Sequence, residues 1–297
     1  MIEFKPITLE ERKKITSYTL LRAPRDCDFS FPNLCAWQFS NNSSYAEIDG
    51  FLVIRFRMED DRLIYLLPIG EGNLVRVITL LEENARKEGQ PFRLQGVYPD
   101  LKNLLEKYFP TLFEYSVYRD FADYLYFRKD LAELKGKNYQ PKRNHVNKFR
   151  KEYNYRYTPL TPDMLPQCLD FESKWCKDHD YMEHPGMKDE RRALTFEIHH
   201  YEALQLSGGA IWVDDEMAAF TFGAPINTDT FDIHVEKANI RLDGVYSMIN
   251  KEFASRLPEQ YVYINREEDL GVPGLRQSKL SYHPAILLEK CIATKNF

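Results

Sequence analysis

The chain has 297 residues, of which 43% are hydrophobic and 14% aromatic, enough apolar material for one large domain or two of about 150 residues. This composition excludes an intrinsically disordered chain. The 45 acidic and 40 basic side chains give a net charge of −5, which argues against binding nucleic acid or anionic lipid through the charge of the whole molecule.

The cysteines and the N-terminus predict a protein of a reducing compartment. Five cysteines are present, an odd number without a Cys-x-x-Cys pair, so we expect neither a disulfide framework nor a zinc ribbon. The first residues lack the apolar block of a secretion signal, and no stretch reaches the roughly 18 to 20 apolar residues of a membrane-spanning helix. We therefore expect a cytoplasmic protein with no membrane-spanning segment.

In the first half, the spacing of apolar residues predicts alternating helices and strands. Thr8 is expected to cap the first helix, and a polar turn joins the first two strands into a hairpin. The predicted helices are 8–20, 74–85 and 101–108, and the predicted strands are 50–57, 62–68, 92–98, 113–118 and 124–127.

The second half repeats this order of elements. Its predicted helices are 163–177, 189–206, 243–257 and 275–281, its predicted strands are 209–213, 217–223, 230–236 and 260–264, and residues 286–291 form a last strand or helix. The repetition predicts an α/β (α+β) fold of two tandem domains, residues 1–134 and 159–297, with mixed sheets flanked by helices. Residues 135–158 form a basic connecting segment between them. The alternative is a single larger α/β domain.

The basic segment is the strongest local anomaly of the sequence. Residues 135–151 hold seven lysines and arginines and one histidine, without an acidic residue. Such clustering suits the phosphates of a cofactor, RNA or lipid headgroups. Pro141 can begin a helix whose first residues, Lys142, Arg143 and Asn144, surround the N-terminal amides and predict an anion site. The alternative is a solvated linker helix.

The predicted strand 230–236 carries polar residues at every second position. Strict alternation places Asp232, His234 and Glu236 on one face, opposite Phe231, Ile233 and Val235. A carboxylate at the end of such a strand is placed to take a proton from an attacking amine, so Glu236 is a candidate base. The alternative is an ordinary half-exposed strand, which is the preferred interpretation for His234.

The helix after this strand predicts a binding site for phosphate. We expect Asp243 to cap the helix, and Gly244 allows a ligand to approach the backbone closely. The free amides of a helix N-terminus then face a pyrophosphate. The alternative is a purely structural cap.

A polar loop follows the predicted strand 260–264, where α/β sheets commonly bind ligands. Glu267 and Asp269 are candidate acid or base groups there. The candidates for substrate binding are Asn265, Arg266 and, from the basic segment, Asn144, and Arg266 is also a candidate to hold an anion. Arg276 and Lys279, in the next short helix, are candidates to hold anions. The alternative is a structural loop stabilised by salt bridges. No metal is expected, because the histidines near Cys176 (His179 and His184) and the pair His199 and His200 fit no zinc or iron spacing.

Two of these segments resemble a known family. Residues 139–149, and residues 264–271 with 274–284, resemble an uncharacterised bacterial family related to the C-terminal domain of phosphatidylglycerol lysyltransferase. The resemblance implies two tandem folds of the Gcn5-related N-acetyltransferase (GNAT) type, as in the Fem peptidoglycan aminoacyl transferases. Its lysyltransferase relatives take their acyl group from aminoacyl-tRNA and deliver it to a lipid.

The resemblance also implies where an acyl-CoA donor lies. GNAT folds place its pyrophosphate on amides at an Arg/Gln-x-x-Gly-x-Gly/Ala sequence, to which Arg241, Gly244, Val245 and Tyr246 correspond here, with Tyr246 in place of the last small residue.

The sequence therefore predicts an acyltransferase that moves an acyl or aminoacyl group from an activated small-molecule donor, coenzyme A thioester, to an amine acceptor. Glu236, Glu267 and Asp269 are the candidate bases, and Tyr282 is the candidate acid for the leaving group. Lys142, Arg143 and Lys279 are expected to neutralise donor phosphates. The alternatives are an aminoacyl transferase that uses aminoacyl-tRNA, and a non-catalytic module that binds a nucleotide ligand or RNA.

Overall fold

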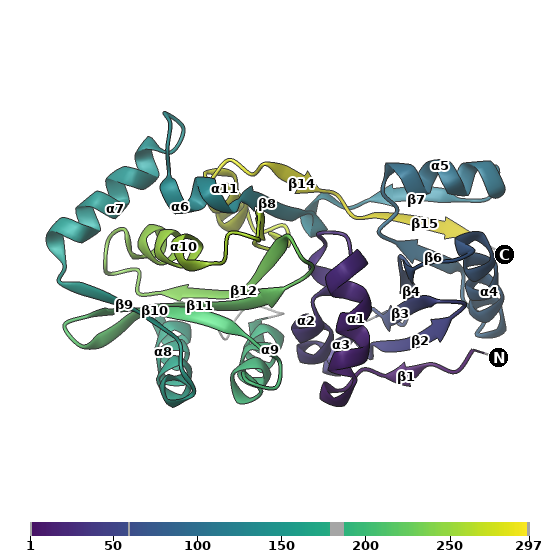
Figure 1. Ribbon diagram of the computed structural model, residues 1–297, viewed down its shortest axis with the longest axis horizontal. Helices are drawn as coiled ribbons and strands as arrows, with labels where there is room; N and C mark the ends of the chain where they lie inside the picture. Colours follow the sequence, from purple (N-terminus) through teal and green to yellow (C-terminus); the bar gives the residue numbers. More distant parts are fainter. Residues whose placement is uncertain (1, 59, 179–186, 296–297) are drawn as a thin grey trace.

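The computed structural model describes residues 2–58, 60–178 and 187–295 and arranges them in two mixed sheets that lie beside each other (Figure 1). The predicted class, α+β with helices flanking mixed sheets, is confirmed. None of the helices in the described ranges is long and apolar enough to cross a membrane.

The first sheet is built mainly from the first half of the chain. Its strands are β1 (Lys5–Pro6), β2 (Ser44–Ile48), β3 (Phe51–Arg57), β4 (Leu63–Leu66), β5 (Ile69–Gly70), β6 (Phe92–Gln95), β7 (Glu114–Val117) and β15 (Cys291–Lys295). They pair in the order β1-β2-β3-β4-β6-β15-β7, with β5 on β3. The predicted hairpin is confirmed, since β3 and β4 pair antiparallel. The helices α4 (Leu74–Lys87) and α5 (Pro99–Tyr108) also confirm their predictions.

The second sheet has the order β14-β8-β13-β12-β11-β10-β9. Its strands are β8 (Asp123–Phe127), β9 (Tyr155–Pro159), β10 (Ser207–Val213), β11 (Glu216–Pro225), β12 (Thr230–Ala238), β13 (Tyr263–Asn265) and β14 (Ile286–Leu288). Helices cover both faces (Figure 1). They are α6 (Arg128–Glu133), α7 (Gln140–Glu152), α10 (Val245–Arg256) and α11 (Pro273–Leu280) on one face and α8 (Leu165–Asp178) and α9 (Met187–His199) on the other.

Three short helices lie between the two sheets (Figure 1). These three are α1 (Arg12–Arg22), α2 (Phe31–Ala36) and α3 (Gln38–Asn41). Elsewhere along the chain the described residues form four 3-10 helices: η1 (Leu9–Glu11), η2 (Cys27–Phe29), η3 (Arg119–Phe121) and η4 (Pro162–Met164). One hydrophobic cluster joins the halves, because it contains Ile15 and Leu52 together with Trp212 and Phe222. The cap predicted for Thr8 is wrong: it precedes η1 without a side-chain capping bond, and α1 starts only at Arg12.

The sheets exchange strands across the middle of the chain. β8 precedes residue 134 but pairs with β13 and β14 in the second sheet. β15, at the C-terminal end, pairs with β6 and β7 in the first sheet. Neither sheet is therefore made only from the residues on one side of residue 134. The sequence analysis did not predict β15, because its last predicted element ended at residue 291.

A β-bulge in β12 decides which of its side chains share a face. Phe222 of β11 pairs with Val235, but the next residue, Gly223, pairs with Ile233, so His234 is the extra residue. A Cβ on Gly223 would lie 1.8 Å from the carbonyl oxygen of Asp232, which explains the glycine.

The bulge corrects the predicted alternation. Phe231 and Ile233 pack in the cluster under α10, whereas Val235 packs in the cluster on the opposite face. Glu236 consequently faces α10, where it contacts Asn250, and His234 faces α9, where it contacts Glu197. The predicted strict alternation is wrong, because the bulge inserts His234 as an extra residue between Ile233 and Val235.

Candidate functional site

The parallel strands β12 and β13 diverge at their carboxyl ends. They pair from Thr230 with Tyr263 to Asp232 with Asn265, after which β13 ends while β12 continues to Ala238. Helix α10 forms the crossover between them, as parallel strands require. Ligands of α/β sheets commonly bind where such strand ends separate, so side chains on both sides of this point are the first candidates for a site.

On the α10 side, five residues form what we call the Glu236 cluster: Glu236, Asn250, Arg266, Tyr282 and Lys142. Glu236 Oε1 accepts a hydrogen bond from Arg266 Nη2 at 2.8 Å, and its Oε2 accepts one from Asn250 Nδ2 at 3.3 Å. The Arg266 guanidinium lies 5.0 Å from the centre of the Tyr282 ring, and Lys142 Nζ lies 3.9 Å from it. The cluster thus joins β12, α10, α7 and the segments after β13 and α11.

Two buried polar atoms of the Glu236 cluster have no hydrogen-bond partner among the described residues. They are Arg266 Nη1, a donor, and Asn250 Oδ1, an acceptor. The Glu236 and Arg266 side chains are 9% and 12% exposed, so their charges are largely shielded from solvent. Because nearly all buried polar atoms of proteins are paired, this donor and acceptor are candidates to contact a ligand.

Burial also changes the proton affinities in this cluster. Burial, reinforced by the charge of Arg266, lowers the pKa of Lys142 to about 8, although Glu236 opposes the shift. Burial raises the pKa of the Tyr282 phenol, whose hydroxyl donates to Ser247 Oγ at 3.3 Å. Lys142 can therefore release a proton near neutral pH, whereas Tyr282 remains a proton donor.

Glu267 is separated from Glu236, although both were predicted as bases. Its Oε1 accepts a hydrogen bond from Asn33 Nδ2 at 2.8 Å, on the side of the sheet that faces α2. Burial raises its pKa to about 7, and the nearby His234 opposes the rise. Glu267 thus belongs to a second polar group, described below, and its role as a base stays a prediction.

Asp269 is occupied by structural partners. Both oxygens accept hydrogen bonds from Arg276, at 2.8 and 2.7 Å, and one oxygen also accepts from the Tyr124 hydroxyl at 2.5 Å. Burial favours a higher pKa, but these bonds outweigh it and hold the pKa of Asp269 well below its usual range. This geometry matches the alternative of a structural salt bridge between Asp269 and Arg276, and the role of Asp269 as a base stays a prediction.

The predicted phosphate-binding cations Lys279 and Arg143 both bind backbone carbonyls instead. Lys279 Nζ donates to the carbonyls of residues 266, 267 and 268, at 2.5 and 3.0 Å for the first two. Arg143 donates to the carbonyls of Leu134 and Gly136. Each side chain holds a loop in place, which is a structural role that spacing along the sequence could not reveal.

Two predicted substrate ligands also bind within the protein. Asn265 is fully buried and donates from Nδ2 to Asp123 Oδ2 at 2.7 Å. Asn144 is exposed on α7 and accepts a hydrogen bond from Gln140 Nε2 at 2.8 Å.

The predicted pyrophosphate site at the start of α10 is covered by α7. Gly244 is the N-cap, with φ of +86°, and a Cβ there would lie 2.4 Å from the carbonyl oxygen of His145 in α7. The amide of Val245 already donates to the carbonyl of Leu242. Asp243 does not cap the helix as predicted but pairs with Lys148 Nζ at 2.6 Å. The residues at this place do not fit coenzyme A.

The other two residues of the predicted coenzyme A sequence differ in exposure. Arg241 is exposed. Tyr246 is partly buried, and burial raises the pKa of its phenol. Arg241 and Tyr246 do not line a surface depression of about 560 Å³ beside α11 or another of about 210 Å³ beside β3. Glu236 and Glu267 line neither of these two depressions.

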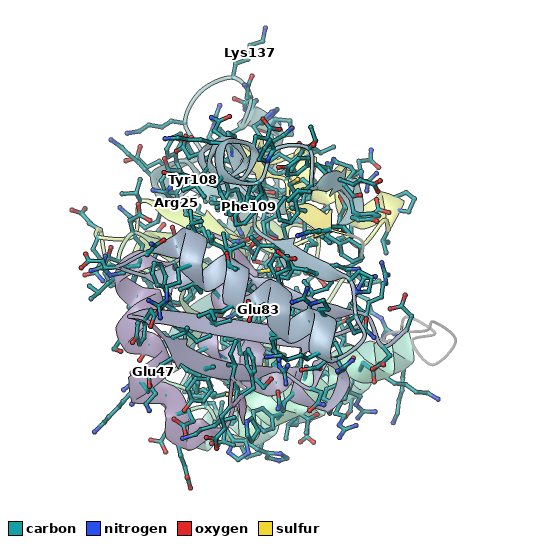
Figure 2. All side chains as sticks on the ribbon, turned by 90° about the vertical axis from the view of Figure 1, so that its right-hand side faces the viewer. Arg25, Glu47, Glu83, Tyr108, Phe109 and Lys137 are labelled. Atoms are coloured by element: carbon teal, nitrogen blue, oxygen red, sulfur yellow. The ribbon has the colours of Figure 1, made fainter. Side chains whose placement is uncertain are left out.

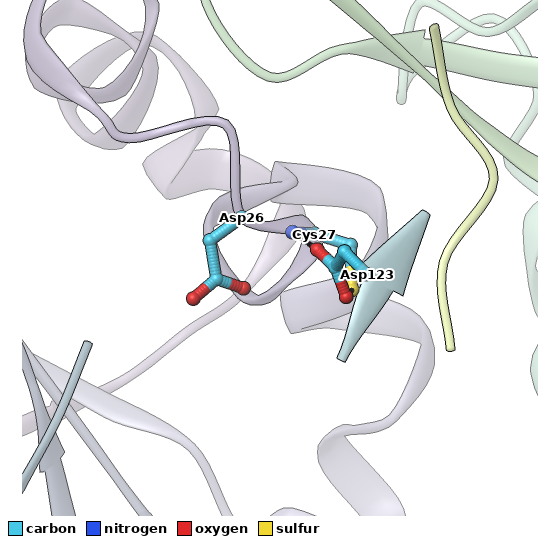
Figure 3. A group of neighbouring side chains, drawn as sticks. All are labelled: Asp26, Cys27 and Asp123. Carbon is cyan, nitrogen blue, oxygen red and sulfur yellow. Dashed lines mark hydrogen bonds between the residues drawn. The ribbon is translucent and has the colours of Figure 1, made fainter. Parts of the chain in front are cut away.

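A buried acidic group lies where the two halves meet, and the sequence analysis missed it. Lys290 Nζ lies 3.3 Å from Asp26, 3.3 Å from Asp28 and 2.9 Å from Asp123, and it also pairs with Glu268. Figure 3 shows Asp26, Cys27 and Asp123, with the Cys27 amide donating to Asp123 at 2.8 Å. These residues are too far apart in the chain for any sequence spacing to connect them.

The fold defines an α+β protein of two mixed sheets joined by exchanged strands. The chain belongs to the phosphatidylglycerol lysyltransferase C-terminal family, which matches residues 20–294, so the resemblance found in the sequence is confirmed. It is similar to a conserved protein of unknown function from Bacteroides thetaiotaomicron, with 49% identity, a TM-score of 0.97 and coverage of 100% of both chains.

More distant relatives share the fold. L-PGS from Bacillus licheniformis is 13% identical with a TM-score of 0.67, covering 98% of this chain and 93% of that one. FemX is 8% identical with a TM-score of 0.61, covering 99% and 98%. An uncharacterized protein of Mycoplasmoides gallisepticum is 24% identical over 204 residues, which are 66% of this chain and 64% of that protein. L-PGS and FemX thus share the fold of this chain.

Proposed function

We propose that this protein transfers an aminoacyl group from an activated ester, aminoacyl-tRNA, to an amine acceptor at the Glu236 cluster. The observation that carries this proposal is the unpartnered pair of Arg266 Nη1 and Asn250 Oδ1, buried where β12 and β13 diverge. A donor and an acceptor beside a lysine of lowered pKa match the needs of acyl transfer to nitrogen.

In this reaction Lys142, in its neutral form, takes a proton from the ammonium group of the acceptor. The free amine attacks the ester carbonyl, and the new C–N bond forms as the carbonyl oxygen gains negative charge, which Arg266 Nη1 stabilises. The C–O bond to the ribose then breaks, and Tyr282 gives its proton to the departing oxygen. The Tyr282 phenolate then takes the remaining extra proton from the nitrogen of the new amide, and the Lys142 ammonium releases its proton to solvent. Glu236 keeps the Arg266 guanidinium in position.

The choice of donor rests on the surroundings of α10. Coenzyme A was favoured from the sequence, but α7 covers the start of α10, where its pyrophosphate was expected. Within the described residues, four lysines and arginines of the connecting segment form ion pairs with acids: Lys135, Lys148, Arg150 and Arg156. Lys137 and Lys151 form none there, and Lys137 extends away from the rest of the protein (Figure 2). Such solvent-facing cations suit the backbone of a tRNA.

A binding experiment separates the donors. The melting temperature is measured with bulk tRNA, coenzyme A and acetyl-CoA in separate samples. We expect tRNA to raise it, with an effect that falls steeply as salt increases. A rise with coenzyme A alone would select the thioester alternative.

A transfer experiment then tests the chemistry. The protein is incubated with a mixture of tRNAs charged with labelled amino acids, and a cell extract freed of macromolecules supplies the acceptor amine. Lys142→Met is expected to slow transfer at least a hundredfold, and the control Lys87→Met, an exposed lysine in α4 beside the first sheet, is expected to retain it. Binding of tRNA without any transfer would support the non-catalytic RNA-binding module instead.

A further inference from the structure

On the side of the second sheet opposite the Glu236 cluster, three ligand-bearing side chains converge. The bulge in β12 turns Asp232 and His234 toward α2 and α9, where Glu267 from the loop after β13 meets them. One ligand atom from each of the three residues lies within 4.8 Å of the other two, and His234 Nε2 lies 3.5 Å from Asp232 Oδ2. We call this group the Asp232 triad.

A buried oxygen of the Asp232 triad is unpartnered. Asp232 is 0% exposed, and its Oδ1 has no hydrogen-bond partner among the described residues. A carboxylate oxygen in such a place is costly unless a proton or a cation meets it.

The histidine is already oriented as a metal ligand. His234 Nδ1 lies 2.6 Å from Glu197 Oε1, and in the neutral ring a proton on Nδ1 that this carboxylate accepts leaves the lone pair on Nε2. In the structure this nitrogen meets the Ser30 hydroxyl at 2.9 Å. An incoming ion would replace that hydrogen bond. Asn33 holds the two carboxylates, donating from Nδ2 to Glu267 at 2.8 Å and to Asp232 at 3.4 Å.

Among the described residues, the neighbouring lysines form no ion pair with the Asp232 triad. Lys279 donates to three carbonyls, and Lys290 pairs with the separate acidic group of Asp26, Asp28, Asp123 and Glu268. In the described part of the chain, neither Asp232 nor Glu267 has a lysine or arginine within ion-pair distance. Three carboxylates, those of Asp232, Glu267 and Glu197, thus surround one imidazole.

We propose that Asp232, His234 and Glu267 bind a divalent metal ion. One imidazole and two carboxylates form a donor set that suits Zn²⁺, Mn²⁺, Fe²⁺ or Co²⁺. Ligand atoms 3.5 Å apart can both lie about 2.1 Å from one ion, the ordinary length of its bonds to nitrogen and oxygen. The site lies on the opposite face of the sheet from the proposed transfer chemistry and does not depend on it.

Metal analysis and titration test this proposal on the full chain. The protein is purified without an affinity tag that binds metal, and its metal content is measured by mass spectrometry before and after dialysis against a chelator. Calorimetric titration with Zn²⁺ and Mn²⁺ follows, and Co²⁺ is added to record its visible absorption spectrum. We expect one equivalent of metal per chain and a Co²⁺ spectrum that reports nitrogen and oxygen ligands.

Paired variants identify the ligands. Asp232→Asn and His234→Gln are expected to weaken binding at least tenfold and to change the Co²⁺ spectrum, while the controls Asp243→Asn and His283→Gln leave both unchanged. If a variant fails to fold, the titration of the wild-type chain still decides. The absence of any metal that binds the wild type below 1 mM, or unchanged binding in both folded variants, would overturn the proposal.

Discussion

Glu236 and Arg266 connect the diverging ends of β12 and β13, with 2.8 Å between Oε1 and Nη2. The pair bridges the point where the sheet opens, and it leaves the second guanidinium nitrogen of Arg266 without a partner among the described residues. An arginine with one nitrogen bound and one free is fixed in direction and able to bind a developing negative charge. Burial favours a lower pKa for Arg266, but Glu236 and two tyrosines outweigh it and raise the pKa, so the guanidinium stays charged.

Replacing Arg266 by lysine should slow transfer without weakening tRNA binding. Arg266→Lys keeps the positive charge beside Glu236 but removes the planar pair of donors, so we expect transfer to slow by about 10²- to 10³-fold with tRNA binding unchanged. Single-turnover transfer and a salt titration of tRNA binding measure the two effects. Arg156→Lys, which alters an exposed arginine 4.6 Å from the Trp212 ring, is the control and should behave as wild type. Equal loss in both variants would contradict a specific role for Arg266.

The pH dependence of transfer should follow Lys142. Because burial lowers the pKa of this lysine to about 8, the neutral amine that accepts a proton becomes more abundant as the pH rises toward that value. We expect the transfer rate to increase about tenfold per pH unit below 8 and to level off above it. Rates are measured between pH 6 and 9 and corrected for spontaneous ester hydrolysis. If Lys142→Met keeps the same rising limb, another group is the base.

Alanine substitutions at two glycines should measure how closely α7 contacts the start of α10. Gly244 and Gly136 have nearly the same φ, +86° and +85°, but only Gly244 has a backbone atom near its missing Cβ, at 2.4 Å. Gly136→Ala should cost about 1 kcal/mol of unfolding free energy for the left-handed backbone alone. Gly244→Ala should cost about 3 kcal/mol, since α7 must also move. Urea unfolding gives both values, and equal costs would mean that α7 moves freely.

Asp269 should stabilise the fold in a pH-dependent way. Its hydrogen bonds to Arg276, Tyr124 and Gly271 hold its pKa well below the usual range, so its contribution is present above the pKa of the unfolded chain, near 4, and disappears as the pH falls through the lower folded value. At pH 7 we expect Asp269→Asn to lose about 3 kcal/mol of unfolding free energy. The difference from wild type should shrink below pH 4. A difference that is constant from pH 7 to pH 3 would show that the negative charge of Asp269 does not matter.

Much of the fold could be predicted from the sequence because helix and strand periodicities are local. The amphipathic helix from Leu74 and the hairpin from Gly50 to Pro68 follow directly from the side chains within them. The sequence also pointed to Glu236, Arg266, Tyr282 and Lys142 as functional residues, and the structure brings these four together.

Local patterns could not reveal what depends on pairing between distant segments. The strand exchange of β8 and β15 depends on which strand edges meet, and no residue within either strand records that choice. The same holds for Lys290, which meets Asp26 and Asp123 only through folding. Lys279 and Asp269 looked like free charges in the sequence, but each has its partners in the folded loop.

The sequence by itself determined many of the helices and strands and the resemblance to the family, because these follow from side chains read in order. Only the tertiary structure decided which of those side chains share a site. A single extra residue in β12 sends Glu236 to one face of the sheet and His234 to the other, since each residue added to a strand reverses the direction of those that follow.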